Sequence, residues 1–344
     1  MTTAPRHVAL LRLSALGDVC QAIPALHALQ TAWPHTRFTW IAGRIEAGLL
    51  QCVPGVTVAT YDKRTGLSGM GRLRRALPRF DLLLHLQTSA RSNLLSLISV
   101  RAREKVGLGR PAAREGHALV VDRQAPLPPR AHAVDTYLAV VRALGIEPGP
   151  ARWDLEIPET ARAWAATQLP DGPWLAVNPS ASPSRRVHRE WPLERMAQVM
   201  DWAAGAGLRV VLVGGPGARE RQRAERLRDL CRSPFLDLTG RTDLPQMLAV
   251  LQRTRLLLSV DSGPVHMATT VGTPVVGLYA ATDPRQTGPY RDLDQVVSAY
   301  PEAVAAEYGR PPEALPWGIR CHDPGAMARI PVAAVTARLQ AVLD

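Results

Sequence analysis

The sequence predicts an α/β protein made of two doubly wound domains, each with a parallel sheet. Short apolar runs of strand type alternate with helical segments along the 344 residues, the pattern of repeated βαβ units. A stretch rich in proline and glycine, 145–173, interrupts this alternation once. The length also suits two domains of ordinary size. We therefore expect one domain over 1–160 and a second over 161–330.

Four strands are predicted in the first domain, at 7–13, 37–41, 57–61 and 81–86. A helix follows the first strand from about Asp18, with Val19, Ile23 and Leu26 on one side. Pro24 lies inside this helix and is expected to bend it. A helix is also expected after each of the other three strands, and a further helix is predicted at 133–144, where Gly145 ends it.

The second domain repeats the alternation. Strands are predicted at 174–178, 208–213, 256–260 and 274–279, and helices at 193–204, 218–231 and 264–271. A last helix at 331–344 is expected to pack back on the first domain. Ligands of such sheets bind beyond the carboxyl ends of the strands, so site residues are sought in the loops that follow them.

Positive charge is concentrated in the first half of the chain. The net charge is 41 − 30 = +11, of which residues 1–150 contribute 19 − 9 = +10. Such a surface suits an anionic partner: a phosphorylated substrate, a membrane surface or nucleic acid. Aromatic residues make up only 5%, which leaves no stacking platform, so nucleic acid is not expected.

One basic stretch, 63–79, contains no acidic residue. Arginines lie there among apolar residues at near-helical spacing, which predicts a basic amphipathic helix. Such a helix could lie on an anionic membrane or meet a phosphorylated lipid. A solvated helix face with ordinary core contacts remains an equal alternative. The residues concerned are Leu67, Met70, Arg72, Leu73, Arg74, Arg75, Leu77 and Arg79.

The loop after the first strand, 14–18, lacks the Gly-x-Gly-x-x-Gly pattern of dinucleotide-binding proteins. Asp18 stands where a helix begins. It is either a capping residue, which binds exposed backbone amides, or a general base at the edge of a cleft. The sequence alone leaves both interpretations open.

Two loops of the second domain favour an anionic ligand. Residues 178–192 supply serines and arginines that suit a diphosphate, although a solvated basic loop is the alternative. Trp191-Pro192 indicates an anchored turn into the next helix. The polar side chains concerned are Ser180, Ser182, Ser184, Arg185, Arg186 and Arg189.

The second loop, 259–266, joins an apolar strand to Asp261-Ser262-Gly263-Pro264 at a helix start, which predicts an anion site. His266 is either part of this site or an ordinary core histidine. No Walker A loop, nucleophile elbow or metal-ligand cluster is found in the sequence, so no metal and no cofactor are expected. The four cysteines are scattered and predict no disulfide framework.

Three motifs together resemble lipopolysaccharide heptosyltransferases, glycosyltransferase family 9, over nearly the full chain. They are 12–18 with Pro24-Ala-Leu26; Arg189-Glu-Trp-Pro192; and 261–266 with Gly272-x-Pro274, Thr282-x-Pro284 and Gly288-x-Tyr290. The opening motif is most similar to that of enzymes that add the first heptose. The resemblance implies a GT-B fold, in which two Rossmann-like domains face a cleft. It places the acceptor in 1–160 and the donor in 161–330.

The resemblance also implies inverting, metal-independent transfer of heptose from ADP-L-glycero-D-manno-heptose to the Kdo–lipid A inner core. Asp18 would be the general base and would face the 261–266 turn across the cleft. The implied donor-binding residues are Arg189, Glu220, Asp261, Ser262, Gly263 and His266. Ser180 and Ser182 are added as donor-binding candidates from the chemistry of their loop, since its serines do not closely match the family. The acceptor-binding candidates are Arg64, Arg72, Arg74 and Arg75.

We expect a cytoplasmic enzyme that associates peripherally with the inner membrane, because the sequence shows no signal peptide and no apolar run of membrane-spanning length. Two other functions stay open: a sugar-nucleotide-binding protein without transfer activity, and a GT-B-like sugar-nucleotide epimerase. The sequence does not decide the oligomeric state.

Overall fold

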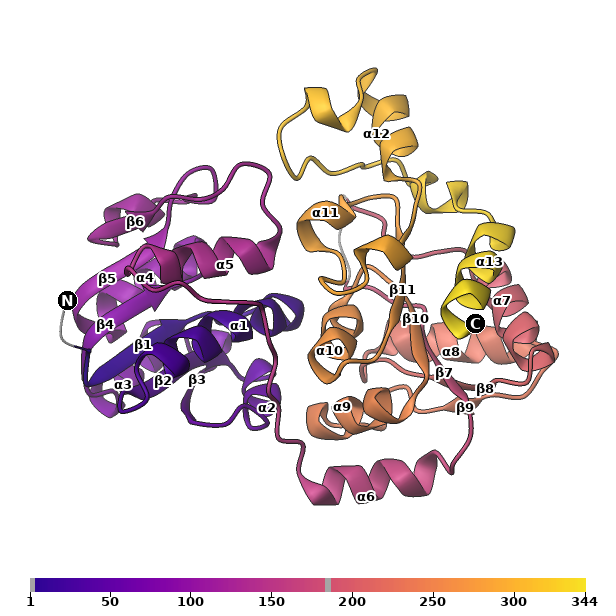
Figure 1. The fold of residues 1–344 in the computed structure, drawn as a ribbon, viewed down its shortest axis with the longest axis horizontal. Helices are drawn as coiled ribbons and strands as arrows, with labels where there is room; N and C mark the ends of the chain where they lie inside the picture. Colours follow the sequence, from indigo (N-terminus) through magenta and orange to yellow (C-terminus); the bar gives the residue numbers. More distant parts are fainter. Residues whose placement is uncertain (1–3, 183–186) are drawn as a thin grey trace. The chain divides into compact units, whose positions relative to one another are not determined.

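The computed structural model describes residues 4–182 and 187–344, and the chain divides into two compact units, Met1–Glu156 and Ile157–Asp344. Each unit holds a six-stranded, wholly parallel sheet with helices against it, which confirms the predicted α/β class (Figure 1). The expected boundary between residues 160 and 161 falls inside a helix, Glu159–Gln168 (α6). This helix packs against Leu244–Arg253 (α9), so it belongs wholly to the second unit.

The first sheet has the order β3-β2-β1-β4-β5-β6, so the direction of strand addition reverses between β1 and β4. Its strands are β1 (His7–Leu11), β2 (Arg37–Gly43), β3 (Val56–Tyr61), β4 (Arg79–His85), β5 (Arg101–Leu108) and β6 (Arg123–Ala125). We did not predict β5 and β6. Charged residues such as Glu104 and Lys105 interrupt the apolar pattern of β5, which lies near the sheet edge.

Helices cover both faces of this sheet. α1 packs against α5, whereas α3 packs against α4 and shares a core with Ala9 and Leu11 of β1. The α-helices are α1 (Leu16–Ala32), α2 (Glu46–Leu50), α3 (Gly66–Ala76), α4 (Ala90–Ser99) and α5 (Ala133–Arg142). Short 3₁₀ turns lie at Lys63–Thr65 and His117–Leu119. Pro24 lies within α1, as predicted.

The basic stretch 63–79 is not one helix. α3 ends at Ala76, and Arg79 is the first residue of β4. Met70, Leu73 and Leu77 are buried in the core, so they cannot serve a membrane or a lipid. Leu67 alone among the four apolar residues is exposed.

The second sheet has the order β12-β11-β10-β7-β8-β9. With β7 in place of β1 and β10 in place of β4, this is the same arrangement as in the first sheet. The strands are β7 (Trp174–Asn178), β8 (Arg209–Leu212), β9 (Leu236–Asp237), β10 (Leu256–Val260), β11 (Val275–Tyr279) and β12 (Val297–Ser298). Its direction of strand addition reverses between β7 and β10.

The second sheet is also covered on both faces. α7, α8 and α13 pack together, and α6, α9 and α10 form another layer. Beyond α6 and α9, the helices are α7 (Leu193–Gly205), α8 (Ala218–Leu230), α10 (Gly263–Val271), α11 (Pro284–Thr287), α12 (Tyr300–Tyr308) and α13 (Val332–Leu343). Three 3₁₀ turns lie at Leu293–Gln295, Pro312–Ala314 and Ala326–Arg329.

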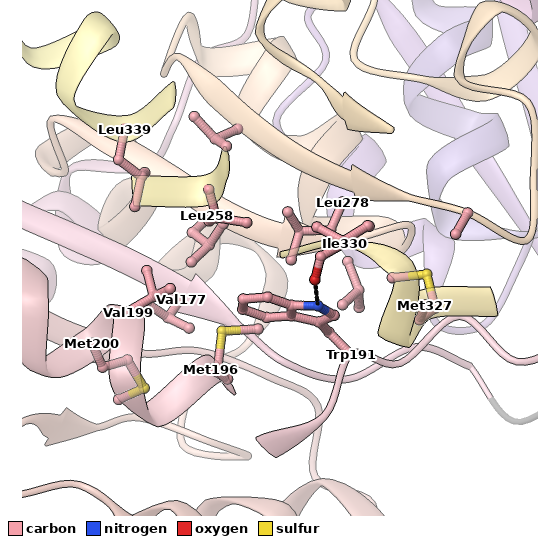
Figure 2. Close-up of a cluster of buried hydrophobic side chains, with 14 of the residues drawn as sticks. Val177, Trp191, Met196, Val199, Met200, Leu258, Leu278, Met327, Ile330 and Leu339 are labelled. Carbon is pink, nitrogen blue, oxygen red and sulfur yellow. Dashed lines mark hydrogen bonds between the residues drawn. The ribbon is translucent and has the colours of Figure 1, made fainter. Parts of the chain in front are cut away.

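We expected the last helix to pack back on the first domain, but its buried residues lie in the core of the second unit. Val335 and Leu339 of α13 are buried in the core of the second unit, with Met196 and Met200 of α7 (Figure 2). A helix with these apolar positions buries them against the nearest apolar surface of its own unit. Sequence position alone could not show which surface that is.

The same core anchors Trp191, as the sequence predicted. Its side chain is buried, and its indole N–H donates a hydrogen bond of 3.2 Å to the carbonyl of Ile330 (Figure 2). The loop before α7 is therefore tied to the chain segment before α13. Among the helices of residues 4–182 and 187–344, none is long and apolar enough to cross a membrane.

Candidate functional site

In the first unit, Asp18 is held at the carboxyl end of the central strand β1. Its Oδ2 lies 2.5 Å from a guanidinium nitrogen of Arg12 and accepts a 3.0 Å hydrogen bond from the N–H of Ala15. Asp18 is thus not the N-cap itself but the third residue of α1, and it caps the helix by accepting from the backbone of the N-cap residue, Ala15. Both contacts use Oδ2, so Oδ1 makes no hydrogen bond within the described chain. The side chain is 35% exposed, and this second oxygen can take up a proton from a bound molecule.

Arg12 itself is fixed from three sides. Besides Asp18, it donates a 2.8 Å hydrogen bond to the carbonyl of Leu86. Its guanidinium also lies 5.6 Å from the centre of the Tyr137 ring, within cation–π distance. The conformation of the Asp18 carboxylate is therefore set by buried neighbours from β1, the end of β4 and α5. Arg12 is the first residue of the 12–18 motif, but no role was predicted for it from the sequence.

A cavity of about 530 Å³ lies beyond the ends of β1 to β4. Its volume falls in the range of ligand pockets, roughly 300–1,000 Å³. Four cationic side chains line it, against the two carboxylates of Glu46 and Asp62. The cations are Arg44, Lys63, Arg64 and Arg91. The excess of positive charge favours an anionic ligand.

The two carboxylates of the cavity differ. Hydrogen bonds from the side chain and backbone of Arg64 lower the pKa of Asp62 to about 2, so Asp62 stays ionised and forms an ion pair with Arg64. Burial raises the pKa of Glu46. Arg64 is therefore partly neutralised, whereas no ion pair of Lys63 or Arg91 is found among the described residues.

Of the four arginines predicted to bind the acceptor, only Arg64 lines this cavity. Arg72, Arg74 and Arg75 lie on α3, and Arg74 donates a 2.7 Å hydrogen bond to the carbonyl of Ile98. The other three cations of the cavity were not predicted from the sequence. Their positions carried a signal, because Arg44, Lys63 and Arg91 each lie close after the end of a strand.

In the second unit, Asn178 joins the ends of the two central strands. Its Nδ2 lies 2.7 Å from the Ser262 hydroxyl, 3.1 Å from that of Ser259 and 2.9 Å from the carbonyl of Ser180. The Ser262 hydroxyl in turn donates to the carbonyl of Val260. It is therefore occupied within the protein, so any contact of Ser262 with a ligand must come from its backbone N–H.

The amino end of α10 provides such backbone groups. Ser262 is the N-cap, Gly263 is the first helical residue, and Pro264 has no N–H to satisfy. The N–H groups of Ser262 and Gly263 make no hydrogen bond within the part of the chain that the structure describes. Together with the helix dipole they form a site for an anion. His266 lies buried in the first turns of the same helix.

Asp261 and Arg189 lie together beside this helix start. A guanidinium nitrogen of Arg189 is 3.4 Å from Asp261 Oδ2, and the Thr282 hydroxyl donates a 2.7 Å hydrogen bond to the same oxygen. Arg189 also donates to the carbonyl of Ser182. Asp261 is buried, whereas Arg189 is partly exposed, so the arginine can still contact a bound anion. The role of Thr282 was not predicted, although its motif was noted.

Ion pairs to helix α8 hold the loop that carries Arg189 in place. The neighbouring Glu190 forms ion pairs with Arg219 and Arg223 of α8, the latter at 3.2 Å. Within this loop Ser180 is buried and Ser182 is exposed. Three further predicted residues, Ser184, Arg185 and Arg186, lie outside the described residues.

Glu220 lies in the first turn of α8, after β8, at the strand end next to β7. Its carboxylate lies so close over Gly217 that a Cβ there would overlap it. The loop after β9 closes on the same segment, because Gly240 donates a 2.9 Å hydrogen bond to Gly214. Gly240 has φ of 69°, and a Cβ on it would lie 2.8 Å from Pro216 Cα. Only glycine fits this close approach.

The predicted donor residues thus gather at the ends of three adjacent strands, β8, β7 and β10. Arg189, Asp261 and the 262–263 amides form one cluster, and Glu220 lies one loop away. Over residues 4–182 and 187–344, no group of three or more His, Cys, Asp or Glu side chains is placed to hold a metal ion.

The family model for glycosyltransferase family 9 (heptosyltransferase) matches residues 70–316. Among curated proteins, the lipopolysaccharide core heptosyltransferase OpsX of Haemophilus influenzae is 36% identical over 342 residues, which cover 98% of this chain and 97% of that protein. Lipopolysaccharide heptosyltransferase 1 of Escherichia coli is 26% identical, over 85% of this chain and 93% of its own.

Solved structures of the same family share the fold. A family 9 glycosyltransferase from Veillonella parvula has a TM-score of 0.81 at 22% identity, covering 98% of this chain and 97% of its own. The E. coli heptosyltransferase WaaC, solved with ADP, has a TM-score of 0.74 at 21% identity, with 98% and 99% covered. At this identity the likeness concerns the fold, and it confirms the expected GT-B class.

Proposed function

The chain belongs to glycosyltransferase family 9, and from this membership we propose that it transfers heptose from ADP-L-glycero-D-manno-heptose to the Kdo–lipid A inner core of lipopolysaccharide. The lipopolysaccharide core heptosyltransferase of H. influenzae, at 36% identity over nearly both chains, supports this substrate class. We propose that the enzyme works on the cytoplasmic side of the inner membrane, where it associates peripherally.

One observation carries the proposed chemistry: the Asp18 carboxylate is held through one oxygen while the other is open. We propose that Oδ1 of Asp18 removes the proton of the acceptor hydroxyl as that oxygen attacks the anomeric carbon of the donor. The bond between this carbon and the diphosphate oxygen then breaks, and ADP leaves. A single displacement of this kind inverts the configuration at the anomeric carbon.

The second unit would hold the donor. Negative charge develops on the diphosphate as ADP leaves, and Arg189 with the amides of Ser262 and Gly263 would stabilise it. Glu220 would bind the ribose of the adenosine. No step of this mechanism requires a metal ion, because the arginine and the helix start supply the positive field.

The first unit would hold the acceptor. The inner core carries carboxylate and phosphate groups, and the cavity beyond β1 to β4 offers Arg44, Lys63, Arg64 and Arg91. Arg64 is the one residue of this set that was also an acceptor-binding candidate from the sequence. Leu13 and Ser14, which connect β1 to the Asp18 segment, line the same cavity, so a bound acceptor would lie near the proposed base.

The test is Asp18→Asn, which keeps the shape of the side chain and removes its basicity. We expect kcat to fall by about 10²–10⁴, the usual contribution of a general base, while the Kd for ADP stays the same. Asp154→Asn, at an exposed carboxylate of the same unit, is the matched control and should keep full activity. Turnover is measured by mass spectrometry with ADP-heptose and truncated lipid A cores.

Other outcomes would contradict the proposal. Retention of most of the turnover in Asp18→Asn would remove Asp18 from the base role, and loss of activity in excess chelator would show a metal requirement. ADP binding without product from any core acceptor would favour a binding protein, and isomerised sugar nucleotide formed without acceptor would favour an epimerase.

A further inference from the structure

Helix α4 buries Leu95 together with several polar side chains, and leaves its other two leucines exposed. Four polar side chains are almost fully buried, whereas Leu94 and Leu97 are 42% and 54% exposed. An amphipathic helix on a soluble protein normally shows the opposite arrangement. The buried polar side chains are Ser92, Asn93, Ser96 and Ser99.

Hydrogen bonds fix this orientation. Ser92 donates to the carbonyl of Gln87, Asn93 donates to that of Glu115, and Ser99 donates 2.9 Å to that of Met70. Rotating α4 to bury Leu94 and Leu97 would break these bonds and leave buried polar groups unsatisfied, which is costly. The two leucines are therefore held toward solvent by the inner face of their own helix.

Helix α3 adds to the same outer surface. It lies beside α4, to which the Ser99–Met70 and Arg74–Ile98 hydrogen bonds attach it (Figure 1). On α3, Leu67 is 66% exposed, and Arg72 and Arg75 are exposed as well. Arg91 is exposed on the first turn of α4. We call Leu67, Arg72, Arg75, Arg91, Leu94 and Leu97 together the α3/α4 surface.

This surface is basic, although the Glu115 carboxylate accepts a 2.6 Å hydrogen bond from the N–H of Ala90 at the start of α4, beside Arg91. Neither helix contains an acidic residue, and none of its three arginines takes part in an ion pair among the described residues. Protein-binding hot spots are built mainly on tryptophan, tyrosine and arginine, but the α3/α4 surface contains no aromatic side chain. Leucines surrounded by unpaired arginines match instead the boundary between anionic headgroups and acyl chains.

We infer that the α3/α4 surface docks the protein on an anionic phospholipid membrane, with Leu67, Leu94 and Leu97 entering the acyl boundary and Arg72 and Arg75 contacting the headgroups. Arg91 belongs both to this surface and to the lining of the basic cavity, so the two are continuous. This deepens the proposed function, because a lipid-bearing acceptor could then place its polar core in the cavity while its acyl chains stay in the membrane.

The experiment is co-sedimentation of the full chain with vesicles of phosphatidylethanolamine containing phosphatidylglycerol, compared with neutral phosphatidylcholine vesicles. We expect the wild type to prefer the anionic vesicles, and Leu67→Ser/Leu94→Ser/Leu97→Ser to reduce partitioning by about ten-fold or more. Arg72→Gln/Arg75→Gln should reduce partitioning by about five-fold or more at low salt, with little effect in high salt. Leu293→Ser, at an exposed leucine of the second unit, is the control.

The same leucine variant separates docking from catalysis. It should keep its ADP affinity, its thermal unfolding temperature and its turnover of a deacylated, soluble acceptor, and lose turnover of an acceptor embedded in vesicles. Equal binding of the wild type to neutral and anionic vesicles, or wild-type binding by the leucine variant, would overturn the inference. Since vesicle binding needs no sugar donor, failure of the proposed transfer activity would leave this result interpretable.

Discussion

Gln87 in the first unit and Asn178 in the second each join the two central strands of their own sheet, but in different surroundings. Gln87 accepts a 2.7 Å hydrogen bond from Leu13 N–H, across the gap between β1 and β4. Asn178 reaches Ser259 and Ser262 across the gap between β7 and β10. Asn178 is only 2% exposed, whereas Gln87 is half-buried and lines the cavity.

The comparison shows that one strand order can support two kinds of site. At the end of the second sheet, hydroxyls, amide and carboxylate satisfy one another, which leaves a rigid helix start with Arg189 beside it. At the end of the first sheet, cations surround an open cavity. A preformed cluster suits a small, invariant nucleotide diphosphate, and an open basic cavity suits a larger acceptor.

Among variants that compare the two units, the largest expected effect is on the KM values, which separate the two sites by substrate. Arg189→Ala should raise the KM for the donor by about 10–100-fold, the loss expected for a hydrogen bond between charged groups, and leave the KM for the acceptor unchanged. Arg44→Ala should do the reverse, by about ten-fold or less because its side chain is largely exposed. Two-substrate steady-state kinetics measures both.

Arg226→Ala, at an exposed arginine of α8, is the control for this pair and should change neither constant. If Arg189→Ala moved the acceptor KM as strongly as the donor KM, the assignment of one substrate to each unit would be wrong.

A smaller effect concerns the two amide side chains. Asn178→Ala leaves a buried carbonyl and two hydroxyls without their donor, so we expect it to lower the free energy of unfolding by about 2–3 kcal/mol. Gln87→Ala should cost about 1 kcal/mol or less, because water can reach the N–H of Leu13. Urea unfolding, followed by hydrogen exchange of each unit, measures the free energy of unfolding of both variants. Equal losses of free energy in the two variants would show that the two strand junctions do not differ as inferred.

The last prediction concerns the acid sensitivity of the first unit. The rings of His85 and His117 are fully buried, with centres 4.6 Å apart. Burial lowers the pKa of His85 to about 3, with His117 adding to the shift, and lowers that of His117 to about 4. The unfolded chain binds these protons near pH 6.5, whereas the folded unit does not.

Stability is therefore complete above about pH 6.5 and falls as the pH drops toward 4, by up to about 1.4 kcal/mol per pH unit for each histidine. Thermal unfolding between pH 7.5 and 4.5 measures how steeply stability falls with pH. His117→Gln should make this fall shallower, even if the variant is also less stable than the wild type at pH 7.5. An unchanged slope would exclude the histidine pair as the cause.

Much of the fold follows from local patterns in the sequence. The strands at 174–178 and 256–260 were predicted with their observed bounds, because a mostly apolar run between turn residues has few other structures open to it. The loops after these strands were identified as sites because ligands of such sheets bind beyond the carboxyl ends of the strands. β5 and α6 were missed, since charged or proline-rich surroundings hide elements whose burial depends on distant partners.

By itself, the sequence determined the class of fold, the family and the loops that carry Asp18, Arg189 and Asp261, because these depend on residue order along short segments. Only the tertiary structure decided that the Ser262 hydroxyl is occupied by Asn178, that α13 packs on its own unit, and that Leu94 and Leu97 face outward. That Asp18 and the 261–266 turn face each other stays a prediction. The physical reason is that burial, pairing and exposure are set by neighbours far apart in the chain, which periodicity within a segment does not encode.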